Sequence, residues 1–392
     1  MKSSFFITLL FFVLPLNAQE LQTLANGNNM FAIQLYQKLA AANKTNLFFS
    51  PYSISTAFAM TYAGARGETA RQIAQVLCFP ADESIHASFA RLEEHLEKNT
   101  LPEKLSLSVA NALWPAEKLP LLPAFLDLTK KYYGAAVFPL DFGNAQSACD
   151  KINHWVEEKT QNKIKDLVSP DVVNSATELV LTNAIYFKGN WKYSFDPKDT
   201  GPAPFWITAD KSVEVSMMHL KNTKIRFMEN ETLQMIELPY QGESISMKIL
   251  LPRDKKSWSA FEQSVRSENL NLWQQELHLQ KIPVALPKFK MTLRFNLADT
   301  LEQMGIVDAF HGGKADFSGM DGAHSLFISA VIHQAFVEVN EEGTEAAAAT
   351  AITMEKSGPP KRFYADHPFI FLIQDQKTGN ILFLGRVMNP SF

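Results

Sequence analysis

The N-terminal part of the chain is dominated by apolar residues at helical spacing. Side chains of this kind recur every three or four positions, with polar residues between them, which is typical of amphipathic helices. The pattern predicts a helical region over 27–98, clearest at 28–43, 53–65 and 70–77, and further helices over 122–133 and 145–168. We therefore expect a mainly helical first half.

The pattern changes after residue 178, where β-branched and aromatic residues take over. The run ELVLTNAIYFKGNW (178–191) predicts a long strand. Shorter runs bounded by Gly, Pro, Asn and Asp predict further strands over 213–219, 233–239, 245–251, 281–286, 326–340, 369–374 and 381–388. One more helix is predicted over 297–305, and the last two strands form a hairpin across DQKTGN. Helices first and strands later, without βαβ alternation, predict an α+β fold with antiparallel or mixed sheets.

The stretch EEGTEAAAATAITMEKSG (341–358) satisfies two incompatible patterns. Alanine is the best helix former, so propensity favours a surface helix. At period two, both Glu345 and Glu355 fall on one face, and the other face carries small or apolar residues: Thr344, Ala346, Ala348, Thr350, Ile352 and Met354. Natural sequences usually avoid such ambiguity unless a conformational switch is required.

Bulk composition limits the class of protein. No linker rich in Pro, Gly or Ser and no low-complexity tract divides the 392 residues, so we expect one large domain. Hydrophobic residues make up 46%, which is enough to bury a sizeable core. The net charge of −4 gives no electrostatic reason to expect nucleic acid or an acidic membrane surface as partner.

The N-terminus has the features of a secretory signal peptide. An apolar run over 5–16, too short to span a bilayer, is followed by Ala18 as the candidate cleavage site. The expected division is a signal peptide over 1–18 and a single domain over 19–392, which makes the protein extracellular, or periplasmic in a bacterium. Asn43 and Asn230 begin glycosylation sequons, which are used only in a host that glycosylates.

Motifs for catalysis are missing from the sequence. It contains no HExxH, GxSxG, P-loop or GxGxxG, and its nine histidines are scattered, so we expect neither an enzyme nor a metal site nor a cofactor. Cys78 and Cys149 are expected as free thiols, although an oxidising compartment would allow them to pair. His333 lies in an apolar strand and is interpreted as a hydrogen-bonded core histidine, and Trp191 as a core aromatic.

Six motifs, in order along the chain, resemble those of the serpin family. They are NLFFSPYSISTAFAMTYAGARGETARQIAQVL (46–77), LTNAIYFKGNW (181–191), LPKFKM (286–291), ADFSGM (315–320), EEGTEAAAATA (341–351) and ADHPFIFLI (365–373). The resemblance runs from about residue 27 to the C-terminus. It implies one domain with three β-sheets, about nine helices and an exposed reactive-centre loop at about 341–362.

The resemblance also implies a function. Inhibitory serpins are suicide substrates: the protease's serine forms an acyl-enzyme with the loop, and the cleaved loop inserts as a new strand in the large sheet. Small inward side chains would ease insertion, and Gly343 would let the backbone swing out of the preceding strand. The expected hinge consists of Glu341, Glu342, Gly343, Thr344, Glu345, Ala346, Ala347, Ala348, Ala349 and Thr350.

The reactive bond is predicted to be Lys356–Ser357. A lysine before the cut suits a trypsin-like protease, whose specificity pocket carries a carboxylate. The commonest family spacing, counted from Gly343, puts Ser357 before the cut, so Met354–Glu355 and Ser357–Gly358 remain alternatives. A non-inhibitory carrier or storage protein and an inhibitor of cysteine proteases are the alternative functions.

Further residues match family positions that control insertion. Ser50, Ser53, Asn183 and His333 match a hydrogen-bonded cluster beneath the large sheet. Trp191 matches the place where the loop enters the sheet, and Lys288 with Glu341 matches a salt bridge beside it. Lys361 and Arg362, after two prolines, are expected in the exit segment of the loop or as a solvated basic pair. The acidic 81–98 segment argues against heparin binding, and an openable sheet carries a risk of polymerisation for a monomer.

Overall fold

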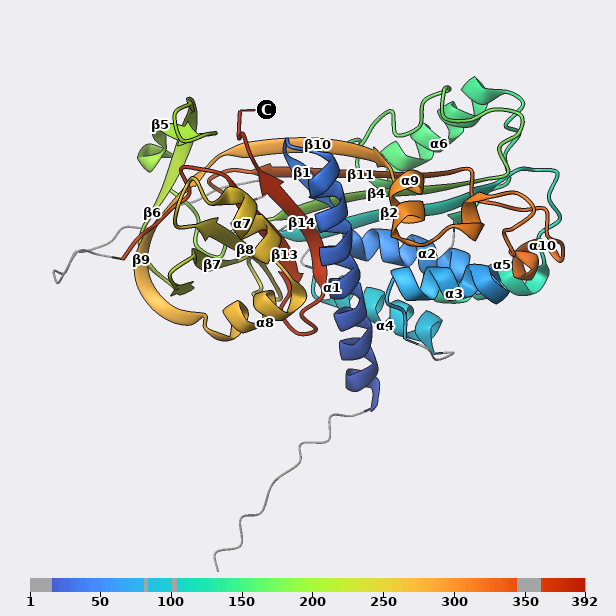
Figure 1. The fold of residues 1–392 in the computed structure, drawn as a ribbon, viewed down its shortest axis with the longest axis horizontal. Helices are drawn as coiled ribbons and strands as arrows, with labels where there is room; N and C mark the ends of the chain where they lie inside the picture. The colour runs from blue at the N-terminus through green and yellow to red at the C-terminus, as the bar shows by residue number, and fades with distance from the viewer. Residues whose placement is uncertain (1–15, 81–83, 101–103, 135, 344–360, 392) are drawn as a thin grey trace, which may run out of the picture.

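A computed structural model describes residues 16–80, 84–100, 104–134, 136–343 and 361–391 (Figure 1). These residues form ten α-helices, two short 3-10 helices and two β-sheets, which confirms the predicted α+β class. No helix within these ranges is both long and apolar enough to cross a membrane.

The five-stranded sheet contains the site described below. Its order is β10 (Phe289–Asn296), β11 (Ala330–Val339), β4 (Leu179–Gly189), β2 (Leu105–Pro115) and β3 (Ala136–Val137). The two neighbours β11 and β4 run parallel, whereas β10–β11 and β4–β2 are antiparallel. Nearly every side chain of β4 is buried, as its continuous apolar sequence requires of a strand covered on both faces.

The described strands form two sheets, not the three that were expected, and the second has nine strands. Strand β6 (Ser212–Glu229) pairs with β9 (His278–Pro287) along most of its length, with a register shift between Leu220 and Thr223. Such an irregularity lets a strand bend while its ladder continues, so the two regions stay joined by hydrogen bonds. The other strands are β1 (Leu47–Phe49), β5 (Gly201–Trp206), β7 (Leu233–Pro239), β8 (Ile245–Pro252), β12 (Phe363–Tyr364), β13 (Phe369–Asp375) and β14 (Ile381–Val387).

Helices cover both faces of the five-stranded sheet, with α2 on one side and α6 on the other (Figure 1). Alternate residues of β4 accordingly contribute to two cores: Leu181 and Ile185 to one, Val180 and Ala184 to the other. The α-helices are α1 (Leu16–Ala42), α2 (Pro51–Gly64), α3 (Gly67–Val76), α4 (Ile85–Lys98), α5 (Pro123–Tyr133), α6 (Ala145–Lys159), α7 (Trp258–Ser264), α8 (Ser267–Gln275), α9 (Ala298–Met304) and α10 (Ser318–Asp321). The 3-10 helices are η1 (Pro197–Asp199) and η2 (Asp308–Phe310).

One predicted helix is shorter in the structure, and one strand beside β4 was not predicted. The helix expected over 145–168 ends at Lys159, because the Thr160 hydroxyl bonds to the carbonyl oxygen of Val156 and the next two residues, Gln161 and Asn162, adopt positive φ. Strand β2 was not predicted at all. It lies between β4 and β3 and pairs with β4 over its whole length.

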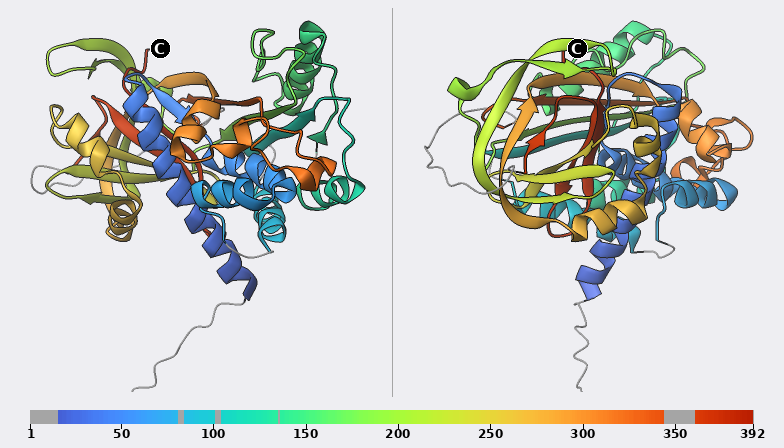
Figure 2. Two further views of the ribbon diagram at one scale, coloured as in Figure 1. Left: turned by 45° about the vertical axis from the view of Figure 1, so that its right-hand side comes forward. Right: turned by 60° about the vertical axis from the view of Figure 1, so that its left-hand side comes forward.

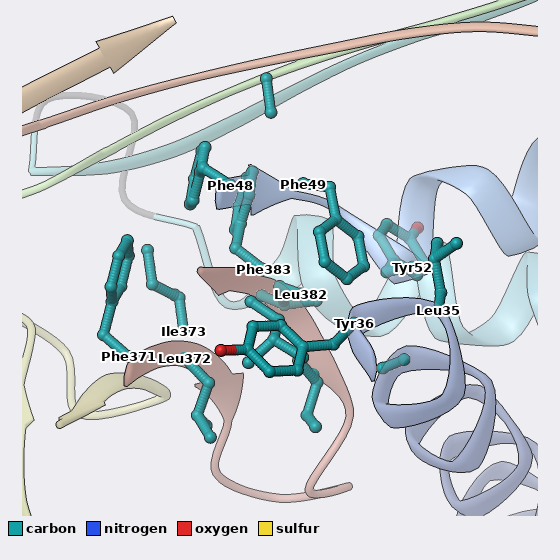
Figure 3. Packing of buried hydrophobic residues seen from close by; sticks show 14 of the residues in the cluster. Leu35, Tyr36, Phe48, Phe49, Tyr52, Phe371, Leu372, Ile373, Leu382 and Phe383 are labelled. Carbon is teal, nitrogen blue, oxygen red and sulfur yellow. The ribbon is translucent and has the colours of Figure 1, made fainter. Parts of the chain in front are cut away.

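The larger core lies between the nine-stranded sheet and helices α1 and α2 (Figure 3). Phe48 stacks on Phe383 and Phe371, with ring centroids 5.2 and 5.7 Å apart, and so joins β1, β14 and β13. Tyr36 of α1 and Tyr52 of α2 complete this region from the helical side. The N-terminal end of α1 projects away from the body of the molecule (Figure 2).

Candidate functional site

The chain turns sharply where β11 ends. The Asn340 N–H donates to the carbonyl oxygen of Gly343 at 2.9 Å, and the Asn340 side-chain oxygen accepts from the N–H of Glu342 at 3.1 Å. Gly343 also forms an isolated antiparallel bridge with Asn190, just after β4. Gly343, within the predicted hinge, therefore lies at the end of the β4–β11 pair.

Only glycine fits at position 343. Its φ is +137°, a conformation that side-chain-bearing residues rarely adopt. A Cβ built there would lie 2.2 Å from the carbonyl oxygen of Gly189 and 2.6 Å from the backbone nitrogen of Trp191. The backbone of the turn is thus packed directly against the backbone that follows β4.

Trp191 fixes the turn through two hydrogen bonds. Its backbone N–H donates to the carbonyl oxygen of Glu342 at 2.8 Å, and its indole N–H donates to that of Asn340 at 3.0 Å. The side chain is 1% exposed, so Trp191 packs in the core as predicted. Removing the indole would leave the Asn340 carbonyl with only the N–H of Gly343, at 3.3 Å, as a donor.

Lys288 and Glu341 form the expected ion pair beside the turn. Their nitrogen and oxygen lie 2.8 Å apart, and the Glu341 carbonyl accepts from the N–H of Phe195 at 2.8 Å. Burial alone would raise the pKa of Glu341, but hydrogen bonds, first that from Lys288, hold the pKa below its usual value. The carboxylate is therefore charged at neutral pH and ties β11 to the link between β9 and β10.

A buried polar cluster lies deeper, across the β4–β11 pair. The backbone N–H of Ser50 donates to Nε2 of His333 at 3.1 Å, so Nε2 is an acceptor and Nδ1 carries the proton. Nδ1 then donates to the side-chain oxygen of Asn183. Burial lowers the pKa of His333 to about 3, which keeps the ring neutral and agrees with this tautomer.

Ser50 and Ser53 connect the cluster to α2 and β14. The Ser50 hydroxyl caps α2 by accepting from the Ser53 N–H at 3.1 Å, and it donates to the carbonyl oxygen of Leu382 at 2.6 Å. The Asn183 amide donates to the Ser53 hydroxyl. All four predicted members of the cluster are thus brought together, and His333 is confirmed as a hydrogen-bonded core residue.

A fifth member, Asn111 on β2, was missed. Its side-chain oxygen accepts from the hydroxyl of Ser53 at 3.0 Å and from the amide of Asn183. The available signal was an asparagine inside the apolar run LSLSVANALWP (105–115), because asparagine is depleted in strands. With Asn111, the cluster joins β2, β4, β11 and α2.

The rest of the predicted site lies outside the described residues. This concerns the hinge from Thr344 to Thr350 and the candidate bonds formed by Met354, Glu355, Lys356, Ser357 and Gly358. Within the described ranges, no group of three His, Cys, Asp or Glu side chains could hold a metal ion. Cys78 and Cys149 are both free thiols, as expected.

Comparison with known proteins identifies the family. The description "Serpin (serine protease inhibitor)" matches residues 26–390, and the chain belongs to the serpin family. It is accordingly a member of a family of protease inhibitors and not an enzyme.

Relatives and solved structures match along nearly the whole chain. Leukocyte elastase inhibitor A of Rattus norvegicus is 42% identical over 381 residues, which is 94% of this chain and 100% of the relative. The Homo sapiens leukocyte elastase inhibitor is 41% identical over the same length and shares of both chains. Uncleaved ovalbumin superposes with a TM-score of 0.85 at 32% identity, covering 94% of this chain and 100% of that one. Serpin48 of Tenebrio molitor gives 0.83 at 33%, covering 96% and 99%.

Proposed function

We propose that the protein is a secreted inhibitor that traps serine proteases as acyl-enzymes by inserting its cleaved loop between β4 and β11. The observation that carries this proposal is the position of Gly343, bridged to Asn190 at the end of these two strands. The loop therefore begins at the seam into which it would insert. Its first residues, beginning with Thr344, are small or apolar at alternate positions, which suits a strand sliding between two others.

The polar cluster supports the same proposal, because it spans the seam. His333 and Asn183 are directly opposite in the register of β11 and β4. A strand placed between them would have to separate their side-chain hydrogen bond. We assign to the cluster the control of sheet opening.

The proposed target is a trypsin-like protease that cuts the loop between Lys356 and Ser357. Lysine would pair with the carboxylate of that enzyme's specificity pocket. The names of the relatives favour a second candidate: proteins 41–42% identical to this chain are called leukocyte elastase inhibitors, and an elastase-like enzyme would use the apolar Met354 before Glu355.

Secretion is supported by how α1 is placed. Cleavage after Ala18 would fall within the first turn of α1, whose N-terminal end projects from the body (Figure 2). Leu24 and Ala25, buried residues of this helix, follow the cleavage point and stay in the mature chain. An N-terminus at Gln19 in protein recovered from culture medium would support export.

The test is to mix the mature protein separately with trypsin, chymotrypsin and elastase. We expect a denaturation-resistant complex with trypsin and a released C-terminal peptide that begins at Ser357. A complex with elastase and a peptide beginning at Glu355 would instead favour the second target. Clean cleavage without a complex, and without a rise in melting temperature afterwards, would establish a non-inhibitory serpin.

A further inference from the structure

The C-terminal end of the reactive loop is held by side chains of the nine-stranded sheet. The Lys361 ammonium lies 2.8 Å from Oε1 of Glu229, at the end of β6. Gln234 of β7, the pairing partner of Glu229, donates both to Oε2 of Glu229 at 3.2 Å and to the carbonyl oxygen of Arg362 at 3.1 Å. Two consecutive exit residues are therefore bound by two facing residues.

This contact precedes a very short strand. β12 consists of Phe363 and Tyr364, lies at the edge of its sheet and pairs in parallel with β9 alone. Phe363 is fully buried, and the N–H of Ala365 donates to the carbonyl oxygen of Ala285 at 3.0 Å. The ladder is only two residue pairs long. The ion pair of Lys361 and the hydrogen bond to the Arg362 carbonyl are therefore a large part of what holds the start of this segment.

The electrostatics of Glu229 fit a role as an anchor. The hydrogen bond from Lys361 is the main cause that lowers its pKa, and Gln234 and the nearby Arg253 act in the same direction. The carboxylate is therefore charged at neutral pH and bound on both oxygens. The alternative expectation of a solvated basic pair at Lys361 and Arg362 is wrong for Lys361, whose side chain is 56% exposed but ion-paired.

We propose that Glu229 is a positioning residue that holds the exit end of the loop, so that the loop inserts only after it has been cut. The proposal rests on the proposed inhibitory function. The intact loop is attached at Gly343 on one side and at Lys361 on the other. Full insertion of an uncut loop requires Lys361 and β12 to detach, whereas a cut loop is free on its hinge side. The Glu229 contact thus opposes only the unproductive reaction.

The first experiment compares Glu229→Gln and Lys361→Met with a matched control, Lys118→Met. Lys118 is 61% exposed and pairs with Glu178 at 2.9 Å, so the control loses an ion pair of the same geometry away from the loop. Uncut protein is incubated without protease, and the remaining capacity to trap trypsin is followed. We expect the two anchor variants to lose capacity about threefold to tenfold faster than wild type, which is the effect of a largely exposed ion pair plus one hydrogen bond. Loss no faster than in Lys118→Met would overturn the proposal.

A second measurement separates this proposal from the proposed function. Hydrogen exchange at the amides of residues 363–366 is measured on uncut protein, which requires no inhibitory activity. We expect faster exchange in Glu229→Gln and in Lys361→Met, and no change in Lys118→Met. If wild type traps no protease, the proposed inhibitory function is wrong, and the exchange data still test whether Glu229 holds the exit segment. If exchange is unchanged in Glu229→Gln, only the role proposed for Glu229 is wrong.

Discussion

The indole ring of Trp191 lies parallel to the phenol ring of Tyr240, with centroids 4.5 Å apart and planes 11° from one another. Both side chains are buried, and their backbones form an isolated bridge between the ends of β4 and β7. The stack therefore connects the two sheets at the point where the reactive loop leaves the five-stranded one. Tyr240 packs against the indole ring, whose N–H donates to the Asn340 carbonyl in the Asn340–Gly343 turn.

Trp191→Phe should destabilise the protein. Phenylalanine can keep part of the stack but removes the indole hydrogen bond, so the carbonyl of Asn340 keeps only the 3.3 Å bond from the N–H of Gly343; the lost bond and the smaller buried ring together cost about 1–3 kcal/mol. The urea midpoint measured by circular dichroism should fall. Trp258→Phe, at a partly exposed tryptophan of α7, is the control and should change stability by less than about 1 kcal/mol. Equal shifts in the two variants would contradict the role assigned to the indole N–H.

Gly343→Ala should lower stability by about 2–5 kcal/mol, the sum of backbone strain and steric overlap. Gly313→Ala separates the two causes. Gly313 also has positive φ, +80°, but a Cβ there has no neighbour within 4 Å, so only strain remains, about 1–2 kcal/mol. Thermal unfolding of both variants checks the difference, and a Gly343→Ala protein as stable as Gly313→Ala would show that the turn can move away.

Thr344→Arg should convert the inhibitor into a substrate. Position 344 is on the face proposed to slide into the sheet, where a long charged side chain would slow insertion and let deacylation win. Cleavage should continue while the denaturation-resistant complex disappears from the gel. Glu345→Arg, one position later on the opposite face, should still trap the protease. Undiminished trapping by Thr344→Arg would refute the insertion mechanism.

Lys356→Leu should redirect the inhibitor. Without the cation, trapping of trypsin should slow by a factor on the order of 100 or more, because the pocket carboxylate is left unpaired. Trapping of chymotrypsin should rise. Association rate constants and the mass of the released peptide check both effects, and unchanged trypsin trapping would reject the Lys356–Ser357 bond.

Stability should fall on acidification partly because of His333. The folded-state pKa is lowered to about 3, below the unfolded value of about 6.5, so the stabilising contribution is complete above pH 6.5. It is lost as pH falls from 6.5 towards 3, since the unfolded state takes up the proton first. Between pH 7 and 5 the loss from this one group is about 2 kcal/mol.

His333→Gln tests this contribution. The variant should be less stable at pH 7, since its cluster is disturbed, but its stability should change less between pH 7 and 5. His154→Gln, at an exposed histidine of α6, should keep the wild-type slope. The same pH slope in His333→Gln and wild type would show that His333 takes up its proton equally in the folded and unfolded states, so that folding does not lower its pKa.

The sequence predicted the fold class well, because the residue pattern within segments such as β4 and α5 is enough to identify a strand or a helix. The strand β2 was missed since Ser106, Ser108 and Asn111 interrupt its apolar run; of these, Asn111 belongs to the buried cluster. Helix α6 was predicted too long, because Ile164, Leu167 and Val168 keep a helical spacing but reach the core from a loop.

The site was predicted mainly through motifs. Ser50, Asn183 and His333 are far apart in sequence, and His333 and Asn183 meet over a separation of 150 positions, so periodicity alone could not pair them. The contacts of Glu229 and Gln234 with the exit segment could not be predicted from the sequence for the same reason. It depends on the register of β6 with β7, which fixes two polar residues opposite each other.

The parallel alignment of β4 with β11 has a directional consequence. A chain that leaves β11 through the Asn340–Gly343 turn and folds back must run opposite to β11, and therefore opposite to β4 as well. A returning strand would replace one parallel interface, paired from Ala330 and Val180 to Phe336 and Tyr186, with two antiparallel ones. Antiparallel ladders are slightly more stable per residue, and there would be two in place of one. The backbone hydrogen bonding would therefore be more stable with the returning strand in place than without it. The directions of β4 and β11 alone would favour the rearrangement in one direction, whatever the side chains.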